Sequence, residues 1–191
     1  MNGGVPELTS ARLRLIVPGG SAAAQLLRYN RQNEAHLRPW DPPWTERHFD
    51  IHALEDALVR DLELARDGRA YRFFIFAREG GDDIIGRVSF NEIVRGAFQA
   101  CFMGYSLAAS AQGHGYMTEA ASAAIKYMFE SAGLHRIMAN YVPENERSAV
   151  VLRRLGFTVE GVAKNYLFIA GSWRDHVLTS LTNPNPAPPQ L

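Results

Sequence analysis

Gln112-Gly113-His114-Gly115-Tyr116-Met117 lies where the sequence predicts that a strand ends, near residue 107, and a helix begins, at about residue 116. Glycines at such a junction adopt backbone conformations that other residues resist, so main-chain amides can turn inward. Those amides meet the positive end of the following helix, and together they favour an anion such as a pyrophosphate. A Gly-x-Gly pair between strand and helix is also a common tight turn, so the motif alone leaves both interpretations open.

Two familiar phosphate-binding motifs are absent from this loop. A P-loop requires Gly-Lys followed by Ser or Thr, which the sequence does not contain. Dinucleotide binding requires a third glycine with a downstream acidic residue in a βαβ unit, and the chain does not supply that combination. An anion site in this loop therefore belongs to another class.

Outward from the loop, helices and strands follow one another without regular βαβ alternation. Upstream, apolar spacing and turn residues predict a strand, two helices and an antiparallel meander of three strands, at residues 8–17, 21–37, 50–67, 71–77, 84–94 and 97–107. Downstream they predict a helix, a strand, a short helix and a hairpin, at residues 116–132, 135–142, 146–155, 166–169 and 173–181. This order predicts a mixed α/β fold of the α+β kind in a single domain, residues 1–183, and a Pro-rich flexible tail, residues 184–191.

Composition narrows the class of protein. The 191 residues are 47% hydrophobic and 21% charged, which suits one soluble domain with a substantial core. Lys plus Arg and Asp plus Glu number 20 each, so bulk charge does not predict nucleic-acid binding. Cys101 is the single cysteine, and no apolar run suits a signal peptide or a membrane span. We therefore expect a cytoplasmic protein without an intrachain disulfide or a membrane partner.

A second motif, Asn145-Glu146-Arg147-Ser148, opens the predicted helix that ends before Gly156. Helix punctuation alone explains it, with Asn145 as N-cap, Ser148 in the first turn and Gly156 after the last turn. The alternative is that both polar side chains bind a ligand. Three helical residues turn by about 300°, so Asn145 and Ser148 lie nearly on one face, as that alternative requires.

Three segments together resemble the coenzyme A-binding half of the GNAT acetyltransferases: Gly104-Tyr105-Ser106-Leu107, the glycine loop with the helix start, and the Asn145-x-x-Ser148 helix. The similarity extends over residues 8–183. It implies the GNAT fold, a mostly antiparallel central sheet with a splayed strand pair, flanked by helices, in which the strand ending at Leu107 carries a bulge. The family often has Gln or Arg three residues before the first glycine, where this chain has Ser110.

The resemblance implies acetyl-coenzyme A as co-substrate and a set of residues that bind it. Strand residues pair with the pantetheine arm, loop amides bind the pyrophosphate, and the asparagine contacts the coenzyme. The implied cofactor-binding residues are Tyr105, Ser106, Leu107, Gln112, Gly113, His114, Gly115, Tyr116, Met117 and Asn145. The resemblance also places Ser148 near the thiol, which makes Ser148 the candidate catalytic acid for the leaving thiolate.

Four further segments, residues 36–40, 94–96, 135–141 and 173–179, resemble one branch of the family, the bacterial ribosomal-protein-alanine N-acetyltransferases. That branch implies acetyl transfer to the N-terminal α-amino group of an alanine in a small-subunit ribosomal protein, by direct attack. The partner is then that protein, free or within a ribosome-assembly intermediate. Two alternatives stay open, acetylation of a small amine and a non-catalytic acyl-coenzyme A-binding module.

The general base does not carry over from the resemblance. Some relatives have a Glu and a Tyr where this chain has Asn140 and Leu152, and another branch has a Glu where this chain has Leu167. Glu92 and Asp175 are the nearest sequence candidates for the base, and for both we favour a structural role. This gap is what keeps the non-catalytic alternative open.

Other conspicuous side chains receive simpler interpretations. Cys101 lies in an apolar strand and is expected to be a buried thiol. His114 and His176 lack metal-ligand spacing, so we expect no metal. The aromatic segment at residues 40–49 either covers the acceptor or packs around a Pro-rich turn. The acidic helix at residues 50–67 either steers a basic protein toward the site or is a solvated face.

Overall fold

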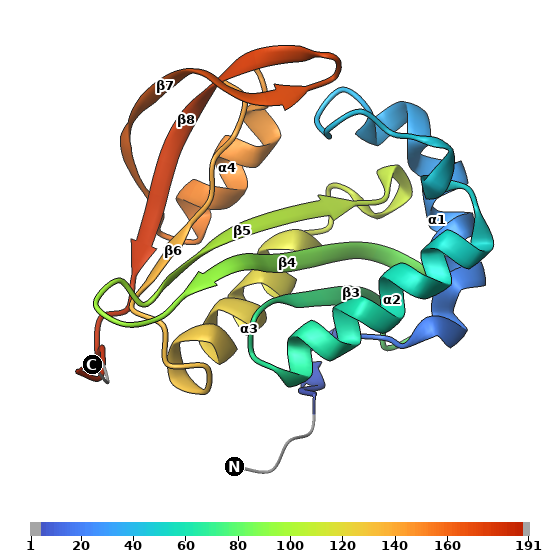
Figure 1. The fold of residues 1–191 in the computed structure, drawn as a ribbon, viewed down its shortest axis with the longest axis horizontal. Coiled ribbons are helices and arrows are strands. Elements are labelled where there is room, and N and C mark those ends of the chain that lie inside the picture. Colours follow the sequence, from blue (N-terminus) through green and yellow to red (C-terminus); the bar gives the residue numbers. More distant parts are fainter. Residues whose placement is uncertain (1–4, 189–191) are drawn as a thin grey trace.

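The computed structural model describes residues 5–188, whose strands form one sheet flanked by helices (Figure 1). The strand order is β1-β2-β3-β4-β5-β6-β8-β7. Neighbouring strands run antiparallel except β5 and β6, which run parallel. The mostly antiparallel sheet confirms the predicted fold class. Across residues 5–188, every helix is too short or too polar to cross a membrane.

The bounds of the elements follow the chain. The strands are β1 (Leu8–Thr9), β2 (Leu13–Ile16), β3 (Tyr71–Ala77), β4 (Ile84–Val94), β5 (Ala100–Leu107), β6 (Arg136–Met138), β7 (Thr158–Ile169) and β8 (Ser172–Thr182). The helices are α1 (Ala23–Leu37), α2 (Ile51–Arg66), α3 (Tyr116–Glu130) and α4 (Glu146–Arg154). Short 3-10 turns lie at Gly20–Ala22, Glu46–His48 and Ala109–Ala111.

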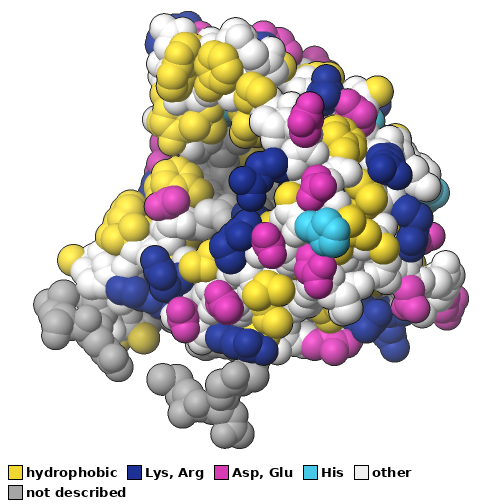
Figure 2. Space-filling model, turned by 45° about the vertical axis from the view of Figure 1, so that its right-hand side comes forward, with side chains coloured by type: hydrophobic (Ala, Val, Ile, Leu, Met, Phe, Trp, Pro, Cys, Tyr) yellow, Lys and Arg dark blue, Asp and Glu magenta, His cyan; other side chains and the backbone are white. Residues whose placement is uncertain are grey.

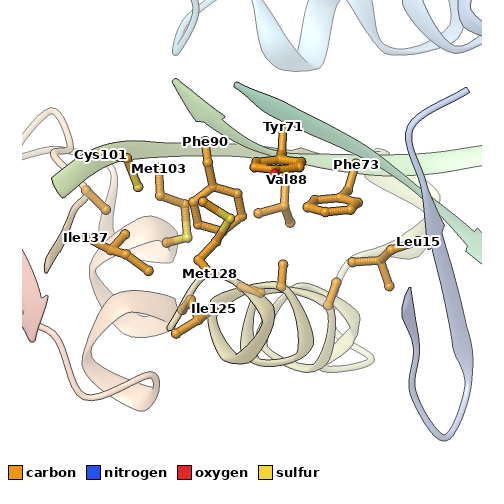
Figure 3. Close-up of a cluster of buried hydrophobic side chains, with 14 of the residues drawn as sticks. Leu15, Tyr71, Phe73, Val88, Phe90, Cys101, Met103, Ile125, Met128 and Ile137 are labelled. Carbon is orange, nitrogen blue, oxygen red and sulfur yellow. The ribbon is translucent and has the colours of Figure 1, made fainter. Parts of the chain in front are cut away.

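Helices cover both faces of the sheet and close a core on each. Beneath one face, Ile125 and Met128 of α3 point toward Phe73 and Phe90 of the sheet (Figure 3). On the other face, α1 and α2 pack against Phe74 and its neighbours. Fully burying a side chain of this size stabilises the fold by about 1.5–3 kcal/mol. The two cores hold the sheet in place from both sides and leave the opening between β5 and β6 to the functional site.

The splayed strand pair is β5 and β6. The two strands pair only where Ala100, Cys101 and Phe102 face Arg136, Ile137 and Met138. Past that point β5 continues to Leu107 paired with β4 alone, whereas the chain after β6 turns toward β8, where Tyr141 forms a bridge with Val177. One edge of β5 therefore faces an open wedge, which confirms the predicted splay.

The expected bulge, however, is not in the strand that ends at Leu107. β5 pairs with β4 in continuous register from Phe102 to Leu107. The register shifts between Asn91 and Val94 of β4, where Glu92 has a φ of 52°. The extra residue thus lies on the neighbouring strand, at the far end from the glycine loop, and the prediction of a bulge in β5 was wrong.

Three elements differ most from their predicted bounds. The strand expected at residues 135–142 is confined to Arg136–Met138. The expected strand at residues 8–17 is two short strands that pair with each other, because the chain bends at Ser10, whose backbone amide bonds to the Leu13 carbonyl. The final hairpin starts at Thr158 rather than residue 166, because β7 continues through irregularities that read as a turn in the sequence. The Pro-rich tail at residues 184–191 stays a prediction, and residues 189–191 lie outside the described part.

Candidate active site

A cleft of about 1020 Å³ occupies the wedge between β5 and the chain that follows β6. Its walls come from the end of β5, the glycine loop, the first turn of α3, the chain after β6, α4 along its length, the end of α1 with the two residues Trp40 and Asp41 beyond it, and one residue of β8. The predicted residues that line it are Tyr105, Ser106, Leu107, Gln112, Gly113, Gly115, Tyr116, Met117, Asn145 and Ser148. His114 is not in this lining; it is exposed, with its ring centroid 5.6 Å from that of Tyr116. The fold thus brings together ten of the eleven predicted site residues.

The glycine loop has the backbone geometry that an anion site requires. Gly113 and Gly115 have φ angles of 82° and 77°, in the left-handed region that favours glycine. Gly115 is the N-cap of α3 and supplies no side chain to the first turn of that helix. The amides of Tyr116, Met117 and Thr118 are therefore left without a capping side chain, at a helix end that attracts negative charge.

An anchor on the outer side holds the first turn of α3. Glu119 Oε1 accepts hydrogen bonds from Ser10 Oγ at 2.7 Å and from the Arg12 amide at 2.8 Å, and Arg12 Nη2 lies 2.6 Å from Oε2. The Arg12 guanidinium also covers the Tyr116 ring, 4.6 Å from its centroid. Partial burial raises the pKa of Glu119, but hydrogen bonds from Ser10 and Arg12 outweigh it and lower that pKa. The anchor joins the β1–β2 bend to the loop.

Two arginines of α4 extend the site beyond the predicted residues. Arg147 and Arg154 line the cleft. Arg147 Nη1 donates to Gln112 Oε1 at 2.5 Å, and the Gln112 amide nitrogen lies 2.9 Å from His36 Nε2. Gln112 thereby links α1 to α4 across the glycine loop. Guanidinium groups suit phosphate oxygens. The sequence analysis missed both arginines, although basic residues within the Asn145-x-x-Ser148 helix were a signal that could have found them.

Asn145 forms the cap that helix punctuation predicts, whereas Ser148 takes a partner that the sequence did not suggest. Asn145 Oδ1 accepts the Ser148 backbone amide at 3.1 Å, so Asn145 is the helix N-cap. Ser148 Oγ instead lies 2.7 Å from Tyr105 Oη, and Tyr105 also donates to the Ser148 carbonyl at 3.3 Å. Burial raises the pKa of Tyr105 to about 12, against the lowering effect of the Ser148 bond. Two protonated hydroxyls therefore stand together where the splay opens, an arrangement able to donate a proton.

The two carboxylates weighed as candidates for the base have structural surroundings. Asp175 accepts from Lys164 Nζ at 2.6 Å and from the Asn165 amide at 3.0 Å, and these bonds hold an irregular part of β7. The hydrogen bond from Lys164 is the main cause that lowers the Asp175 pKa. Glu92 lies at the β4 bulge, outside the cleft lining. Both placements agree with the structural role we favoured.

The other residues discussed as reactive groups are also held by the fold. Cys101 is fully buried, and burial raises its pKa to about 12, which agrees with a core thiol. Asn140 donates to Tyr166 Oη at 3.2 Å and accepts the Thr179 amide at 3.2 Å. No cluster of three potential metal-binding side chains occurs within residues 5–188.

In the aromatic segment after α1, one aromatic residue borders the cleft and the others pack around the Pro-rich turn. Trp40 lines the cleft, whereas Trp44 stacks on His48 and packs against Phe49. Asp41 ties this segment to the β7–β8 hairpin, because its carbonyl accepts the Ala170 amide at 3.1 Å. The segment and the hairpin tip therefore meet over one end of the cleft. Figure 2 shows hydrophobic side chains gathered at the top of the molecule, where this hairpin lies, above a hollow.

The acidic helix does not border the cleft. None of the cleft-lining residues belongs to α2. Asp61 of α2 forms a two-pronged ion pair with Arg72 Nη1, at 2.8 and 2.7 Å, and so serves the fold. Asp56 and Glu63 are exposed. This placement favours the solvated-face interpretation.

Comparisons with known proteins agree with this geometry. Residues 12–158 match the acetyltransferase (GNAT) domain family. The chain is 44% identical to the [ribosomal protein uS5]-alanine N-acetyltransferase of Escherichia coli (strain K12), over 95% of this chain and 93% of that protein. Among solved structures, the ribosomal-protein-S5-alanine acetyltransferase of Vibrio fischeri matches with a TM-score of 0.91 and 38% identity, over 96% of this chain and all of that one. Mycobacterium smegmatis RimJ in complex with CoA-disulfide matches with a TM-score of 0.88 and 28% identity, over 96% and 92%.

Proposed function

Because the chain belongs to the GNAT acetyltransferase family, we propose that it transfers the acetyl group of acetyl-coenzyme A to the N-terminal α-amino group of an alanine in a small-subunit ribosomal protein. The observation that carries the proposal is the identity of 44% to a uS5-alanine acetyltransferase along almost the whole of both chains. The partner is the ribosomal protein, free or in an assembly intermediate, with no direct nucleic-acid contact. The activity belongs in the cytoplasm, where ribosomal proteins are made.

The wedge suits the coenzyme because its edges offer unpaired backbone groups of the right kind. β5 from Met103 to Leu107 pairs on one side with β4, while its other edge faces the cleft. A pantetheine arm carries amides that can pair with such an edge. The amides around Gly113 and Gly115, together with Arg147 and Arg154, would hold its phosphates. The coenzyme supplies the activated acetyl group.

The chain's own residues would then stabilise the oxyanion intermediate and protonate the leaving thiolate. Backbone amides of β5 between Gly104 and Leu107 are placed to stabilise the oxyanion that forms when the amine attacks the thioester carbonyl. Ser148, backed by Tyr105, would donate a proton to the departing thiolate. An α-amino group has a pKa of about 8, so at neutral pH most of it must lose a proton before it attacks.

The opposite end of the cleft is the natural entrance for the acceptor. Trp40 and Asp41 line this end, and the hairpin tip contacts Asp41 through the Ala170 amide. A protein N-terminus needs only a short extended segment to enter beside them. Because the wedge is open on one side, it can admit the N-terminus of a folded protein, whereas a small amine would be expected to need an enclosed pocket. This point, and the relatives, place the peptide acceptor ahead of a small amine.

Thiol-release kinetics with acetyl-coenzyme A test the proposal. The acceptors are a peptide that begins with the Ala-starting N-terminus of a small-subunit ribosomal protein, the same peptide with its amine blocked, and a panel of polyamines, amino acids and aminoglycosides. We expect turnover on the Ala peptide, none on the blocked peptide, and slow turnover on the small amines. Fast turnover on a small amine with none on the peptide would overturn the acceptor, and no turnover at all would overturn the enzyme.

A further inference from the structure

His176 is an imidazole that forms part of the cleft wall. It is 3% exposed and lines the cleft from β8. β8 pairs residue by residue from His176 onward, so its side chains alternate between the faces of the sheet. Leu181 lies beside Gly156, which follows α4, with 3.7 Å between a Leu181 methyl carbon and a Cβ built on that glycine. His176, five residues earlier, therefore points away from α4 and away from the face that holds Ser148.

One contact fixes the tautomer of this ring. His176 Nδ1 lies 3.1 Å from the Arg174 carbonyl oxygen. A carbonyl oxygen only accepts, so Nδ1 must carry the hydrogen of this bond. In the neutral ring the lone pair is then on Nε2. The backbone of β8 thus sets His176 up as a proton acceptor at Nε2.

The Nε2 atom opens into the cleft. It makes no hydrogen bond to the protein, and among residues 5–188 no side-chain nitrogen or oxygen is both buried and unpaired. The nitrogen must therefore have access to solvent, which at this site means the cleft. Tyr166 lies against the ring with 5.5 Å between centroids, and its hydroxyl is held by Asn140 at 3.2 Å. The imidazole is consequently supported on one side and open on the other.

Other proton acceptors in the cleft already have partners or lie on the other face. The Asp41 carboxylate is held by an indole N–H at 3.0 Å and a guanidinium at 3.5 Å. Glu144 pairs with Arg174 at 3.1 Å, and His36 is bound through Nε2 by an amide. Glu146 is the first residue of α4, the helix that carries Ser148 of the hydroxyl pair. His176 is the imidazole left with a free nitrogen.

We propose that His176 is the general base of the acetyl transfer and receives the proton of the acceptor ammonium on Nε2. The inference rests on the function proposed above. The ammonium gives one proton to Nε2, and its nitrogen forms a bond to the acetyl carbonyl carbon. The carbon–sulfur bond breaks as a second N–H proton leaves to solvent, and the thiolate takes a proton from the Ser148–Tyr105 pair, which solvent restores. His176 returns its proton to solvent, so one proton is released per ammonium acetylated.

This arrangement puts the base and the acid on opposite faces of the splay. The amine would approach from the His176 side and the sulfur would leave on the Ser148 side, so each group meets the atom that it serves. The titratable and charged groups around His176 are Tyr166 on β7, Tyr141 and Glu144 after β6, Arg174 and Asp175 on β8, and His36 and Asp41 across the cleft.

The test compares His176→Asn with the wild-type chain over pH 6 to 9.5. Asparagine keeps a donor where Nδ1 meets the Arg174 carbonyl but removes the base, so a structural role alone would survive the change. The measurement is kcat at saturating acetyl-coenzyme A, with whichever acceptor the wild type uses best. We expect kcat of the variant to fall about 100-fold at pH 7, the low end of general-base effects. The gap should close above the pKa of the acceptor amine, about 8 for an α-amine, because the amine then loses its proton unaided.

The pH dependence separates a base from a merely structural residue. A loss of the same factor at every pH, or no loss at all, would overturn the assignment. If His176→Asn does not fold, His176→Gln replaces it and is judged by the same pH dependence. The control is His52→Asn on the exposed face of α2, whose kcat should match that of the wild type at every pH. The assay uses the acceptor on which the wild-type enzyme turns over fastest. The test of His176 therefore still applies if the proposed ribosomal acceptor is wrong.

Discussion

Replacing Ser148 with alanine isolates the acid half of the proposed chemistry. The change removes one hydroxyl, 2.7 Å from Tyr105 Oη, and leaves the backbone amide that Asn145 caps. Tyr105 keeps its weaker bond to the carbonyl of residue 148 at 3.3 Å, so its buried hydroxyl retains a partner. We therefore expect a stability loss of about 1 kcal/mol, the net value of one neutral hydrogen bond. A domain of this size would then melt about 2–4 °C lower.

The effect on chemistry should be larger than the effect on folding. Loss of a general acid costs 10²–10⁴-fold, and we expect about 10²-fold in the single-turnover rate, or roughly 2.7 kcal/mol, because a thiolate is a fair leaving group. The assay is rapid-quench acetyl transfer at saturating acetyl-coenzyme A, with coenzyme affinity from calorimetry and a thermal melt on the same sample. Affinity should stay within a few-fold of the wild type.

Tyr105→Phe completes a double-mutant cycle with Ser148→Ala. If the two hydroxyls act as one proton donor, the double variant should be no slower than Ser148→Ala alone, because groups that act as a unit are strongly non-additive. Two results would refute the reasoning. An unchanged single-turnover rate in Ser148→Ala removes the serine from the mechanism. Fully additive losses in the double variant show that Tyr105 acts independently of it.

Four further substitutions, one of them a control, probe the scaffold around the site. Gly113→Val and Gly133→Val place a side chain at similar φ angles with nothing within 4 Å, so both should cost comparable stability, but only Gly113→Val should weaken coenzyme binding in calorimetry. Asn145→Ala should lose about 1 kcal/mol of stability in denaturant titrations through the missing cap, and a loss near zero would contradict the capping geometry. Because the fold lowers the Glu119 pKa, its stabilising effect is present above the unfolded pKa and is lost as pH falls through the folded one. Glu119→Gln should therefore lower the melting temperature most near pH 7 and little at about pH 3, and an equal effect at both would refute an ionic anchor.

Local signals were sufficient for the parts of the site that lie within one turn of the chain. The glycine loop, the Asn145 cap and the starts of α3 and α4 follow from residues that are neighbours in sequence. Their spacing in the sequence was therefore enough to predict the local backbone geometry. The positions of most strands were also within reach, because apolar runs and turn residues marked them.

Contacts across long sequence separations were not readable. Ser148 meets Tyr105 over 43 residues, and Glu119 meets Arg12 over 107. Sequence spacing gives no measure of such pairs, since they depend on which strands the core brings side by side. The irregular course of β7 likewise hid the position of His176 from the sequence analysis. Its extra residues between Ala163 and Leu167 read as loop, so nothing indicated that the ring opposite them would face the cleft.

The splay between β5 and β6 also has a mechanical consequence. Within the sheet, three residue pairs form the whole seam between the five strands before it and the three after it. A coenzyme seated along the free edge of β5 would lengthen that seam and act as a strut between the two halves. Binding of this kind stabilises the folded chain by about RT ln(1 + [L]/Kd), close to 2.7 kcal/mol at a hundredfold excess over Kd. The cellular supply of acetyl-coenzyme A would then set how long the protein survives proteolysis, as well as how fast it works.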